Sequence, residues 1–397
     1  MLRDKLMKRL TEREEEMIAL RRHFHENAEI SHHEFQTAET IAAFYEGKDV
    51  HIQRNVGNGV GIVVTIEGKS PGKKIGLRAD FDALPIEEET GLAFSSKNPG
   101  AMHACGHDGH TAYLMILADS LIELKGEWSG TVKIVHQHAE EDPPSGGKSI
   151  AESGVLDDLD EIYGIHFFPN FDVGEINYTS GWAFAGCSDL SIKIKGKGGH
   201  GSMPHLSNDA IVAASSLVMN LQTVVSRRVN PYDMAVVTIG SFEGVGASNV
   251  IKDSLILRGD ARYMDVEVGK QIEKEIRQLL RGLEESFGVE TEFEYLWDYP
   301  PVYNHPDQTE KVVAALEKYG VGDYMDKVVA GPASNGAEDF GQYLLKIPGS
   351  FVNVGCKPDT EDYYMNHHPK FDLNEKALLV AAKAVGDIAL SALGEQD

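Results

Sequence analysis

One nine-residue segment concentrates side chains that could bind a metal ion. Residues 102–110, MHACGHDGH, hold three histidines, a cysteine and an aspartate just before a predicted helix. Thiolate, imidazole and carboxylate groups are ligands of zinc and related divalent ions, and the Cys-x-His spacing lets Cys105 and His107 reach one site from a turn. A buried cysteine beside solvated histidines is the alternative, but so many ligand types in one turn disfavour it. The segment therefore predicts a metal site.

A pair of glutamates forms the second candidate feature. In HQHAEED (136–142), Glu140 and Glu141 follow the strand-like run TVKIV. Carboxylates at the end of a strand suit a metal hydrolase, because one can bind metal while its neighbour holds a water as general base. Alone, such a pair is more often a solvated turn. Beside the Cys-x-His segment, the catalytic interpretation is favoured.

Three further places carry possible ligands or their supports. His166, in YGIHFFP, follows a strand at the edge of the sheet where α/β proteins place ligands, although a structural core histidine is an equal alternative. His367 and His368, in NHHP, precede the last long helix, where a polar loop is the alternative. Asp80 and Asp82 end another strand, in RADFDALP, where a carboxylate could orient a metal-bound imidazole.

The elements that must position these residues alternate between strands and helices. The first part of the chain predicts two strands within 59–80, a helix over 107–125, and strands at TVKIVHQH and IYGIHFFP. The last part predicts a helix near 308–319, a strand at 350–355 and a helix at 373–393. Such alternation indicates an α/β layer with a largely parallel sheet. The first 24 residues predict a single amphipathic helix.

The middle of the chain follows a different order. The pattern predicts β-α-β-β-α-β, the order of a ferredoxin-like unit, with elements at 190–196, 208–228, 234–242, 254–264, 266–287 and 289–297. We therefore expect a discontinuous α/β domain, residues 1–185 and 296–397, interrupted by an inserted domain over 186–295.

Composition excludes several classes of protein. The 397 residues include 37 Lys and Arg against 62 Asp and Glu, a net charge of −25 that disfavours nucleic-acid binding. No run approaches the roughly 18 apolar residues that span a bilayer, so we expect no membrane segment. Three cysteines cannot form a disulfide framework, which favours a reducing, cytoplasmic location.

Together, these motifs resemble a known family. RADFDALP, MHACGHDGH, HxxAEE, GIHFFP, GKGGHGSMPH, GxxASNVI, AEDF and HHPKF occur in the order seen in dinuclear metallopeptidases of the aminoacylase and glutamate-carboxypeptidase type. The chain is most similar to the amidohydrolase branch, which contains hippurate hydrolases, N-acetyl-diaminopimelate deacetylases and plant auxin-conjugate hydrolases. The resemblance runs from His25 to Phe371.

The resemblance implies a ligand set for two divalent ions, zinc or manganese, with cobalt or nickel also suited. Cys105 would be shared by both ions. The remaining ligands would be His107, Glu141, His166 and His367. His367 is preferred to His368 because it stands two residues before Pro369. Glu140 would be the general base, and Asp82 would orient a ligand.

In the family, the inserted domain is a lid that often also forms the dimer. The resemblance implies that His200 polarises the scissile carbonyl when the lid closes, and that Asn249 and Arg262 contact the substrate, Arg262 at its carboxylate. A purely structural insert is the alternative. Two positions depart from the family, which usually has proline where this chain has His138 and Lys252. Neither is a ligand, but His138 could affect the Glu140 pKa or substrate choice.

These features predict a metal-dependent amidohydrolase. Its expected substrates are N-acyl amino acids or small peptides, cleaved by a metal-activated water, in a homodimer or higher homo-oligomer. A dipeptidase or aminopeptidase-like activity on the same metals is the alternative within enzymes. A metal-binding scaffold without turnover is the alternative outside them, although the intact Glu140 disfavours it.

Overall fold

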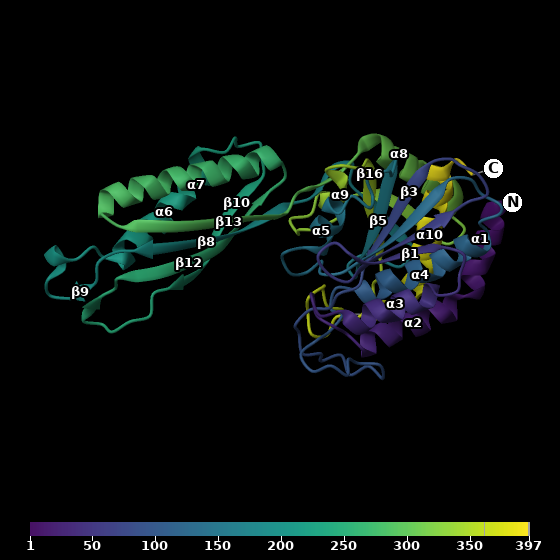
Figure 1. The fold of residues 1–397 in the computed structure, drawn as a ribbon, viewed down its shortest axis with the longest axis horizontal. Coiled ribbons are helices and arrows are strands. Elements are labelled where there is room, and N and C mark those ends of the chain that lie inside the picture. Colours follow the sequence, from purple (N-terminus) through teal and green to yellow (C-terminus); the bar gives the residue numbers. More distant parts are fainter. Residues whose placement is uncertain (361, 396–397) are drawn as a thin grey trace. The chain divides into compact units, whose positions relative to one another are not determined.

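The computed structural model describes residues 1–360 and 362–395. The chain divides into two compact units, each described by itself (Figure 1). The first comprises Met1–Ala183, Tyr303–Pro332 and Asp339–Asp397, and the second Phe184–Val302 and Ala333–Glu338. The chain passes between the units within strands β7 (Gly181–Phe184) and β14 (Val302–Asn304), and again after Pro332 and after Glu338.

Within the described residues, the main sheet of the first unit has eight strands in the order β1-β2-β4-β3-β5-β16-β6-β15. Its strands are β1 (His51–Val56), β2 (Gly61–Glu67), β3 (Lys74–Asp80), β4 (Thr131–Gln137), β5 (Glu161–Phe168), β6 (Glu175–Tyr178), β15 (Lys327–Ala330) and β16 (Gly349–Gly355). The central run β4-β3-β5-β16 is parallel, whereas β1 and β2 are antiparallel additions at one edge. The predicted α/β class with a largely parallel sheet is confirmed.

Helices cover this sheet (Figure 1). They are α1 (Leu2–Glu12), α2 (Glu14–Glu26), α3 (Phe35–Tyr45), α4 (His107–Glu123), α5 (Gly146–Glu152), α8 (Pro306–Ala315), α9 (Gly341–Leu344) and α10 (Lys376–Leu393), with a π-turn at Leu316–Gly320. Helices α4 and α10 pack against each other and against β3, and α2 packs on α4. Every residue of α4 from His107 to Ile122 is buried, so this helix is fixed within the core.

Two features of the first unit differ from the sequence prediction. The prediction of a single N-terminal helix is wrong, because the helix is interrupted at Arg13 (φ −112°, ψ 16°) and two helices, α1 and α2, form instead. Leu6, Leu10 and Met17 are still buried, so the apolar periodicity continues through the break. Helix α3 and strands β1, β6 and β15 were not predicted.

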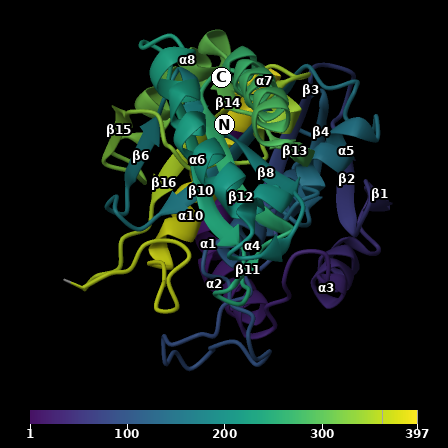
Figure 2. The ribbon, with the colours of Figure 1, turned by 90° about the vertical axis from the view of Figure 1, so that its left-hand side faces the viewer.

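The second unit contains a four-stranded antiparallel sheet in its described part, in the order β10-β12-β8-β13. Its main elements follow the chain as β8 (Gly186–Lys195), α6 (Ala210–Arg227), β10 (Ala235–Glu243), β12 (Ser254–Tyr263), α7 (Val266–Phe287) and β13 (Glu290–Tyr299). Helices α6 and α7 pack side by side on the sheet (Figure 2) and bury one apolar core with it. A small pair, β9 (Gly199–His200) and β11 (Val250–Ile251), and a 3-10 turn at Pro204–Leu206 extend beyond one end.

Helix α6 is the one helix in the described part of the chain that is long and apolar enough to cross a membrane. Its buried residues, which include Ala213, Leu217 and Leu221, instead face the core of its own unit.

Candidate metal centre

The candidate ligands gather at one edge of the main sheet. Strands β4, β3 and β5 are parallel neighbours, so their carboxyl ends lie at the same edge. Asp80 is the last residue of β3, Glu140 and Glu141 follow the end of β4, and His166 lies near the end of β5. Residues far apart in sequence are thereby brought together at the position where α/β sheets place ligands.

Cys105 and His107 enter this edge from the start of α4. Gly106 is the N-cap of α4 and has a φ of 92°, a left-handed conformation that suits glycine. This turn allows the thiol and the imidazole on its two sides to converge. The ligand atoms of Cys105, His107 and His166 lie within 4.8 Å of one another.

The two glutamates and His367 complete the cluster. The same 4.8 Å limit holds for the ligand atoms of Cys105, Glu141 and His367, and for those of His107, Glu140 and Glu141. Cys105 therefore belongs to one group with His166 and to another with His367, which is the arrangement of a ligand between two ions. All five residues expected to bind metal lie together, with Glu140 beside them.

Hydrogen bonds aim two imidazoles at the cluster. His107 Nδ1 lies 3.0 Å from the Asp82 carbonyl oxygen and 3.2 Å from Asp82 Oδ1, and His166 Nδ1 lies 2.8 Å from the Phe167 carbonyl oxygen. Each Nδ1 thus donates to the protein, which leaves Nε2 as a lone-pair donor for a cation. His166 Nε2 accordingly faces Cys105 Sγ at 3.3 Å.

The polar atoms at the centre fit a pair of divalent cations. His107 Nε2 and Glu141 Oε1 are buried without a hydrogen-bond partner among the described residues, and they lie 3.7 Å apart. Burial, together with the charges of Glu141 and Glu140, raises the pKa of Cys105 well above its ordinary value. A thiolate in this position therefore needs a cation beside it. The residues present fit a metal centre.

The structure also separates the two neighbouring histidines of the NHHP loop. His367 has a positive φ of 68°, its N–H donates to the Ala104 carbonyl oxygen at 2.7 Å, and its Nε2 lies 3.3 Å from Glu141 Oε1. The ring of His368 instead stacks on Tyr364 with centroids 4.3 Å apart. His367 is thus the histidine beside the cluster.

The remaining predicted residues lie in the second unit. His200, on β9, pairs with Val250, and the Asn249 carbonyl oxygen accepts the Gly201 N–H at 2.8 Å. Arg262, on β12, pairs with Cys187 of β8, and its Nε donates to Asp260 Oδ2 at 2.7 Å. His200 and Asn249 are therefore neighbours, whereas Arg262 lies along the sheet from them.

A buried ionic network supports the centre and was only partly predicted. Arg78 donates to Asp80 and to Asp339, both at 2.7 Å, and Asp80 Oδ1 lies 2.6 Å from His110 Nδ1. The Asp339 N–H donates to Glu140 Oε1 at 3.4 Å. Asp339, from the AEDF motif, also accepts a hydrogen bond from Gln137 Nε2 of β4 at 2.6 Å. No local sequence pattern reveals that Asp339 lies beside Glu140.

His138 turns toward the β1–β2 connection. Its Nε2 lies 3.3 Å from Asn58 Oδ1, and a Cβ added at Gly59 would overlap the imidazole. A Cβ added at Gly146 would overlap the His138 carbonyl oxygen. Burial lowers the pKa of His138 to about 4, so the ring is neutral at physiological pH. Lys252, the other departure from the family, follows β11 and accepts the Ala210 N–H at its carbonyl oxygen, 3.4 Å away.

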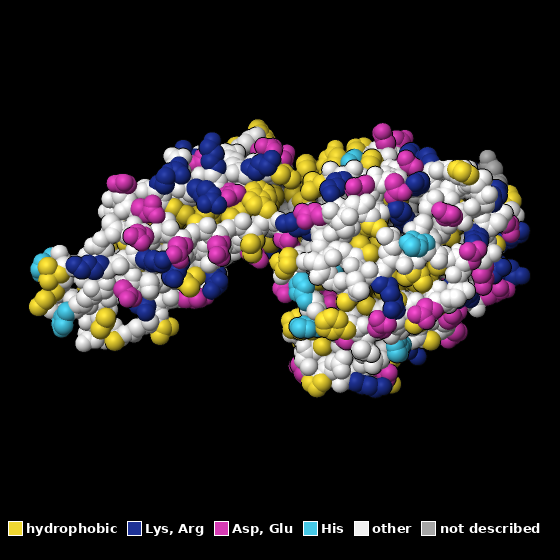
Figure 3. Space-filling model, in the orientation of Figure 1, with side chains coloured by type: hydrophobic (Ala, Val, Ile, Leu, Met, Phe, Trp, Pro, Cys, Tyr) yellow, Lys and Arg dark blue, Asp and Glu magenta, His cyan; other side chains and the backbone are white. Residues whose placement is uncertain are grey.

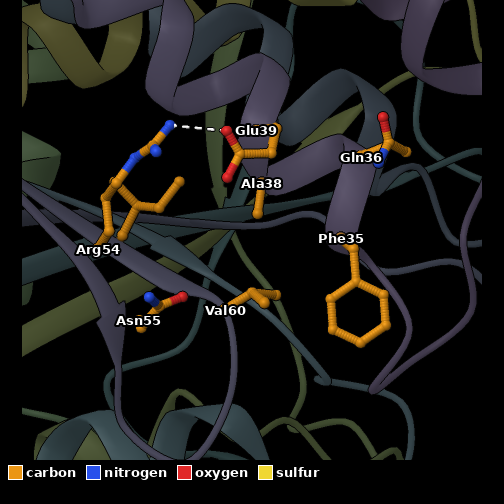
Figure 4. A pocket seen from close by; sticks show the side chains of 8 residues that line it. Phe35, Gln36, Ala38, Glu39, Arg54, Asn55 and Val60 are labelled. Atoms are coloured by element: carbon orange, nitrogen blue, oxygen red, sulfur yellow. Dashed lines mark hydrogen bonds and ion pairs between the residues drawn. The ribbon is translucent and has the colours of Figure 1, made fainter.

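A separate surface pocket of about 180 Å³ lies at the junction of α3 with β1 and β2 (Figure 4). Arg54 and Glu39 form an ion pair across it at 3.0 Å, and Phe35 and Asn55 also line it. Its lining contains none of the residues of the metal cluster.

Comparison with known proteins decides the family. The sequence profile of peptidase family M20/M25/M40 matches residues 76–391. The chain belongs to this family. The Bacillus subtilis protein YhaA, which carries the name of an amidohydrolase, is 43% identical over 378 residues, covering 95% of this chain and 94% of its own. An N-acetyldiaminopimelate deacetylase of Streptococcus thermophilus is 39% identical over 378 residues, 94% and 97% of the two chains.

A solved structure supports the metal interpretation. The Bacillus subtilis YXEP protein, described as a dinuclear metal-binding peptidase of the M20 family, matches with a TM-score of 0.81 and 33% identity over 96% of this chain and 99% of its own. This M20 protein is therefore an enzyme that hydrolyses amide bonds with the help of divalent metal. The predicted family and enzyme class are confirmed.

Proposed function

We propose that this M20 enzyme hydrolyses N-acyl amino acids, with short peptides as the alternative substrates. The observation that carries the proposal is the buried group of Cys105, His107 and His166, with the carboxylates of Glu140 and Glu141 beside His107. The names of the deacetylase and amidohydrolase relatives support an acyl-amide substrate.

The metal ligands we propose follow from this cluster. Cys105 would bridge two divalent ions, and the other ligands would be His107, Glu141, His166 and His367. When bound, the two ions would lower the pKa of a water and polarise the scissile carbonyl. Thiolate and imidazole suit zinc, while the carboxylate also accepts manganese, cobalt or nickel. Asp82 would hold His107 in the tautomer that presents Nε2.

Glu140 would move the protons of the reaction. Glu140 is 6% exposed, and its carboxylate oxygen lies within 4.8 Å of the ligand atoms of His107 and Glu141. It can therefore accept a proton from a water held at the cluster. After attack on the carbonyl, Glu140 would return that proton to the leaving amine.

We propose that the second unit is a ferredoxin-like lid, inserted over residues 186–295 between catalytic parts 1–185 and 296–397. The sheet order β10-β12-β8-β13 and the two helices on it support this assignment. His200 and Asn249 would contact the scissile group, and Arg262 would bind the substrate carboxylate.

The lid geometry favours a homodimer in which two chains build each site. His200 lies just beyond the end of the sheet where Ser254 pairs with Lys195, whereas Arg262 pairs with Cys187 at the other end. Eight residues of extended strand separate Ser254 from Arg262, roughly 26 Å. One lid therefore does not bring both side chains to one substrate.

Exposed apolar residues support a partner at the His200 end. Met203, Leu206 and Val250 are 48%, 56% and 56% exposed there, and Val245 is 94% exposed. Figure 3 shows hydrophobic and histidine side chains gathered at this end of the second unit. We propose that His200 enters the site of a second copy, whereas Arg262 serves its own chain.

The composition supports a cytoplasmic location.

The test compares substrates and one variant. Acetyl-, benzoyl- and longer-acyl amino acids would be assayed beside dipeptides, with zinc and with manganese, and chelator should abolish turnover. Glu140→Gln should retain both metals but lose about 10²–10⁴-fold in kcat, because it removes the proton acceptor. Faster turnover of dipeptides would favour the peptidase alternative. Absence of turnover on every substrate would favour the scaffold, and an active Glu140→Gln enzyme would remove Glu140 as base.

A further inference from the structure

Glu34 is a fully buried glutamate at the start of helix α3. It is the N-cap residue of α3, yet its side chain makes no capping hydrogen bond. Glu29 performs that function instead, because its carboxylate accepts the N–H groups of Gln36 and Thr37 at 3.2 and 2.8 Å and the Thr37 hydroxyl at 2.9 Å. The neighbouring Phe35 points to the surface pocket of Figure 4, whereas Glu34 is fully buried. Helix formation therefore does not explain this carboxyl group.

The Glu34 side chain instead reaches the loop that carries the two catalytic-centre glutamates. Its Oε1 accepts the Ala139 N–H at 2.7 Å. Ala139 has a φ of 45°, in the left-handed region that alanine rarely adopts, and its carbonyl oxygen accepts the Gly146 N–H at 2.8 Å. A non-glycine residue in this conformation needs support from its surroundings. Glu34 supplies one side of that support.

A second buried carboxyl group acts on the other side of Glu140. Asp82 Oδ2 accepts the Glu141 N–H at 3.0 Å and the Ser31 hydroxyl at 2.7 Å. The peptide N–H groups before and after Glu140 are thus each held by a carboxyl group. Residues 30 and 83 also form a parallel bridge, which fixes the segment of Glu34 beside that of Asp82.

We propose that Glu34 is a positioning residue for Glu140, acting with Asp82 to fix the turn that aims the base. This inference rests on the proposed role of Glu140. Glu34 touches neither substrate nor metal in this arrangement; it acts through the Ala139 peptide.

The protonation of Glu34 supports an uncharged acceptor at this position. Burial and the nearby charge of Asp82 raise the pKa of Glu34 to about 8. A neutral carboxyl group and a glutamine amide have similar size, and both offer a carbonyl oxygen to Ala139. Glutamine should therefore replace Glu34 in function, whereas leucine fills the space without an acceptor.

The experiment uses these two variants in the full-length, metal-loaded enzyme. Glu34→Leu should lower kcat about 100-fold, the scale of a base displaced by about 1 Å, while KM and metal content stay within about threefold. Glu34→Gln should keep kcat within about threefold of the parent. Glu29→Leu is the matched control, because it removes a carboxylate that accepts backbone N–H groups in the same segment, and it should lower the melting temperature without lowering kcat. Wild-type kcat in Glu34→Leu, or failure of rescue in a folded Glu34→Gln, overturns the proposal.

A second measurement separates this proposal from the assignment of the base. In the Glu140→Gln background, Glu34→Leu should cost no more than about threefold, because it acts through the side chain already lost. A further loss of about 100-fold in kcat in this background overturns the proposal. Amide hydrogen exchange at Ala139 should accelerate in Glu34→Leu and not in Glu34→Gln, and unchanged exchange overturns it as well. If Glu140→Gln itself remains active, the base assignment falls, and the exchange result alone decides whether Glu34 holds this turn.

Discussion

The buried histidines of the first unit differ in the group that their Nε2 atom faces. His107 and His166 each donate one nitrogen to a protein oxygen and turn the other to the cluster. His136, on β4, instead places Nε2 2.9 Å from the Tyr45 hydroxyl, in a fully buried pair. Burial lowers the pKa of His136 to about 3, so it stays neutral in the folded protein.

The buried His136 predicts a loss of stability in acid. Its pKa is about 3 when folded and 6.5 when unfolded, so below pH 6.5 the unfolded chain binds a proton that the folded chain does not. This contribution is fully present above pH 6.5 and is lost as the pH falls toward 3, about 2 kcal/mol by pH 5. In His136→Gln, the difference in unfolding free energy between pH 7 and pH 5 should shrink by about that amount. Urea unfolding at both pH values measures it, and an unchanged difference contradicts it.

At the residue scale, the sequence reveals the candidate metal ligands and Glu140 better than the buried residues that position them. Cys105 and His107 are recognisable because ligand types recur within one turn, and Glu140 with Glu141 because two carboxylates end a strand. Glu34 is not recognisable, because its contact with Ala139 spans 105 residues. A buried glutamate that serves a distant peptide group has the same local sequence as a solvated one.

At the scale of elements, α2 and α4 are joined by a buried ion pair. Arg21 Nε donates to Asp108 Oδ2 at 2.8 Å, and both side chains are no more than 1% exposed. Asp108 follows His107 in the first turn of α4 and also contacts His25 Nδ1 at 2.8 Å. The ion pair therefore anchors the helix whose first turn carries the candidate ligands.

Removal of Arg21 should destabilise the protein strongly. Arg21→Met leaves the Asp108 carboxylate buried with less compensation, which costs about 3–5 kcal/mol of unfolding free energy. Arg22→Met is the control, because Arg22 is 49% exposed and its pair with Glu375 is worth less than about 1 kcal/mol. Chemical denaturation of the two variants measures the contrast, and equal losses would contradict this view of the helix pair.

The elements that the sequence did not predict share weak patterns. The buried residues of α3 include Thr37 and Ala38, small side chains that give little apolar periodicity. Strand β1, with the sequence HIQRNV, buries only its last residue, and β6 and β15 have only four residues each. The break at Arg13 leaves the apolar spacing intact, so periodicity does not reveal it. The strands and helices with long apolar runs, such as β4 and α4, were predictable because burial on several sides requires such runs.

At the scale of the whole molecule, charged side chains and exposed apolar side chains are distributed differently on the surface. The net charge of −25 does not gather in one patch on the face shown in Figure 3, where acidic and basic side chains are interspersed. The exposed apolar residues near His200 stand apart from this pattern. A homodimer built through the second unit would cover such residues and would supply His200 to another chain.

Mixed dimers should reveal which chain supplies each residue. A purified heterodimer of one His200→Ala chain and one Glu140→Gln chain should keep about half the activity of the parent dimer, because one of its sites is intact if His200 acts on the other chain. A heterodimer of one Arg262→Ala chain and one Glu140→Gln chain should stay impaired. If Arg262 serves its own chain, each of the two sites carries one of the defects and neither site is intact. Two chains carrying different affinity tags allow the mixed dimer to be isolated. An inactive first heterodimer would place His200 in the site of its own chain.

The packing of His138 against Gly59 has an evolutionary consequence. A Cβ at Gly59 would overlap the imidazole, so a larger residue there requires the buried ring of His138 to move. The reverse substitution carries no such conflict, because a smaller side chain at 138 leaves the glycine undisturbed. The two positions therefore form an epistatic pair. A lineage that gains a side chain at 59 must move or lose the histidine at 138, whereas a lineage that loses the histidine first meets no such conflict.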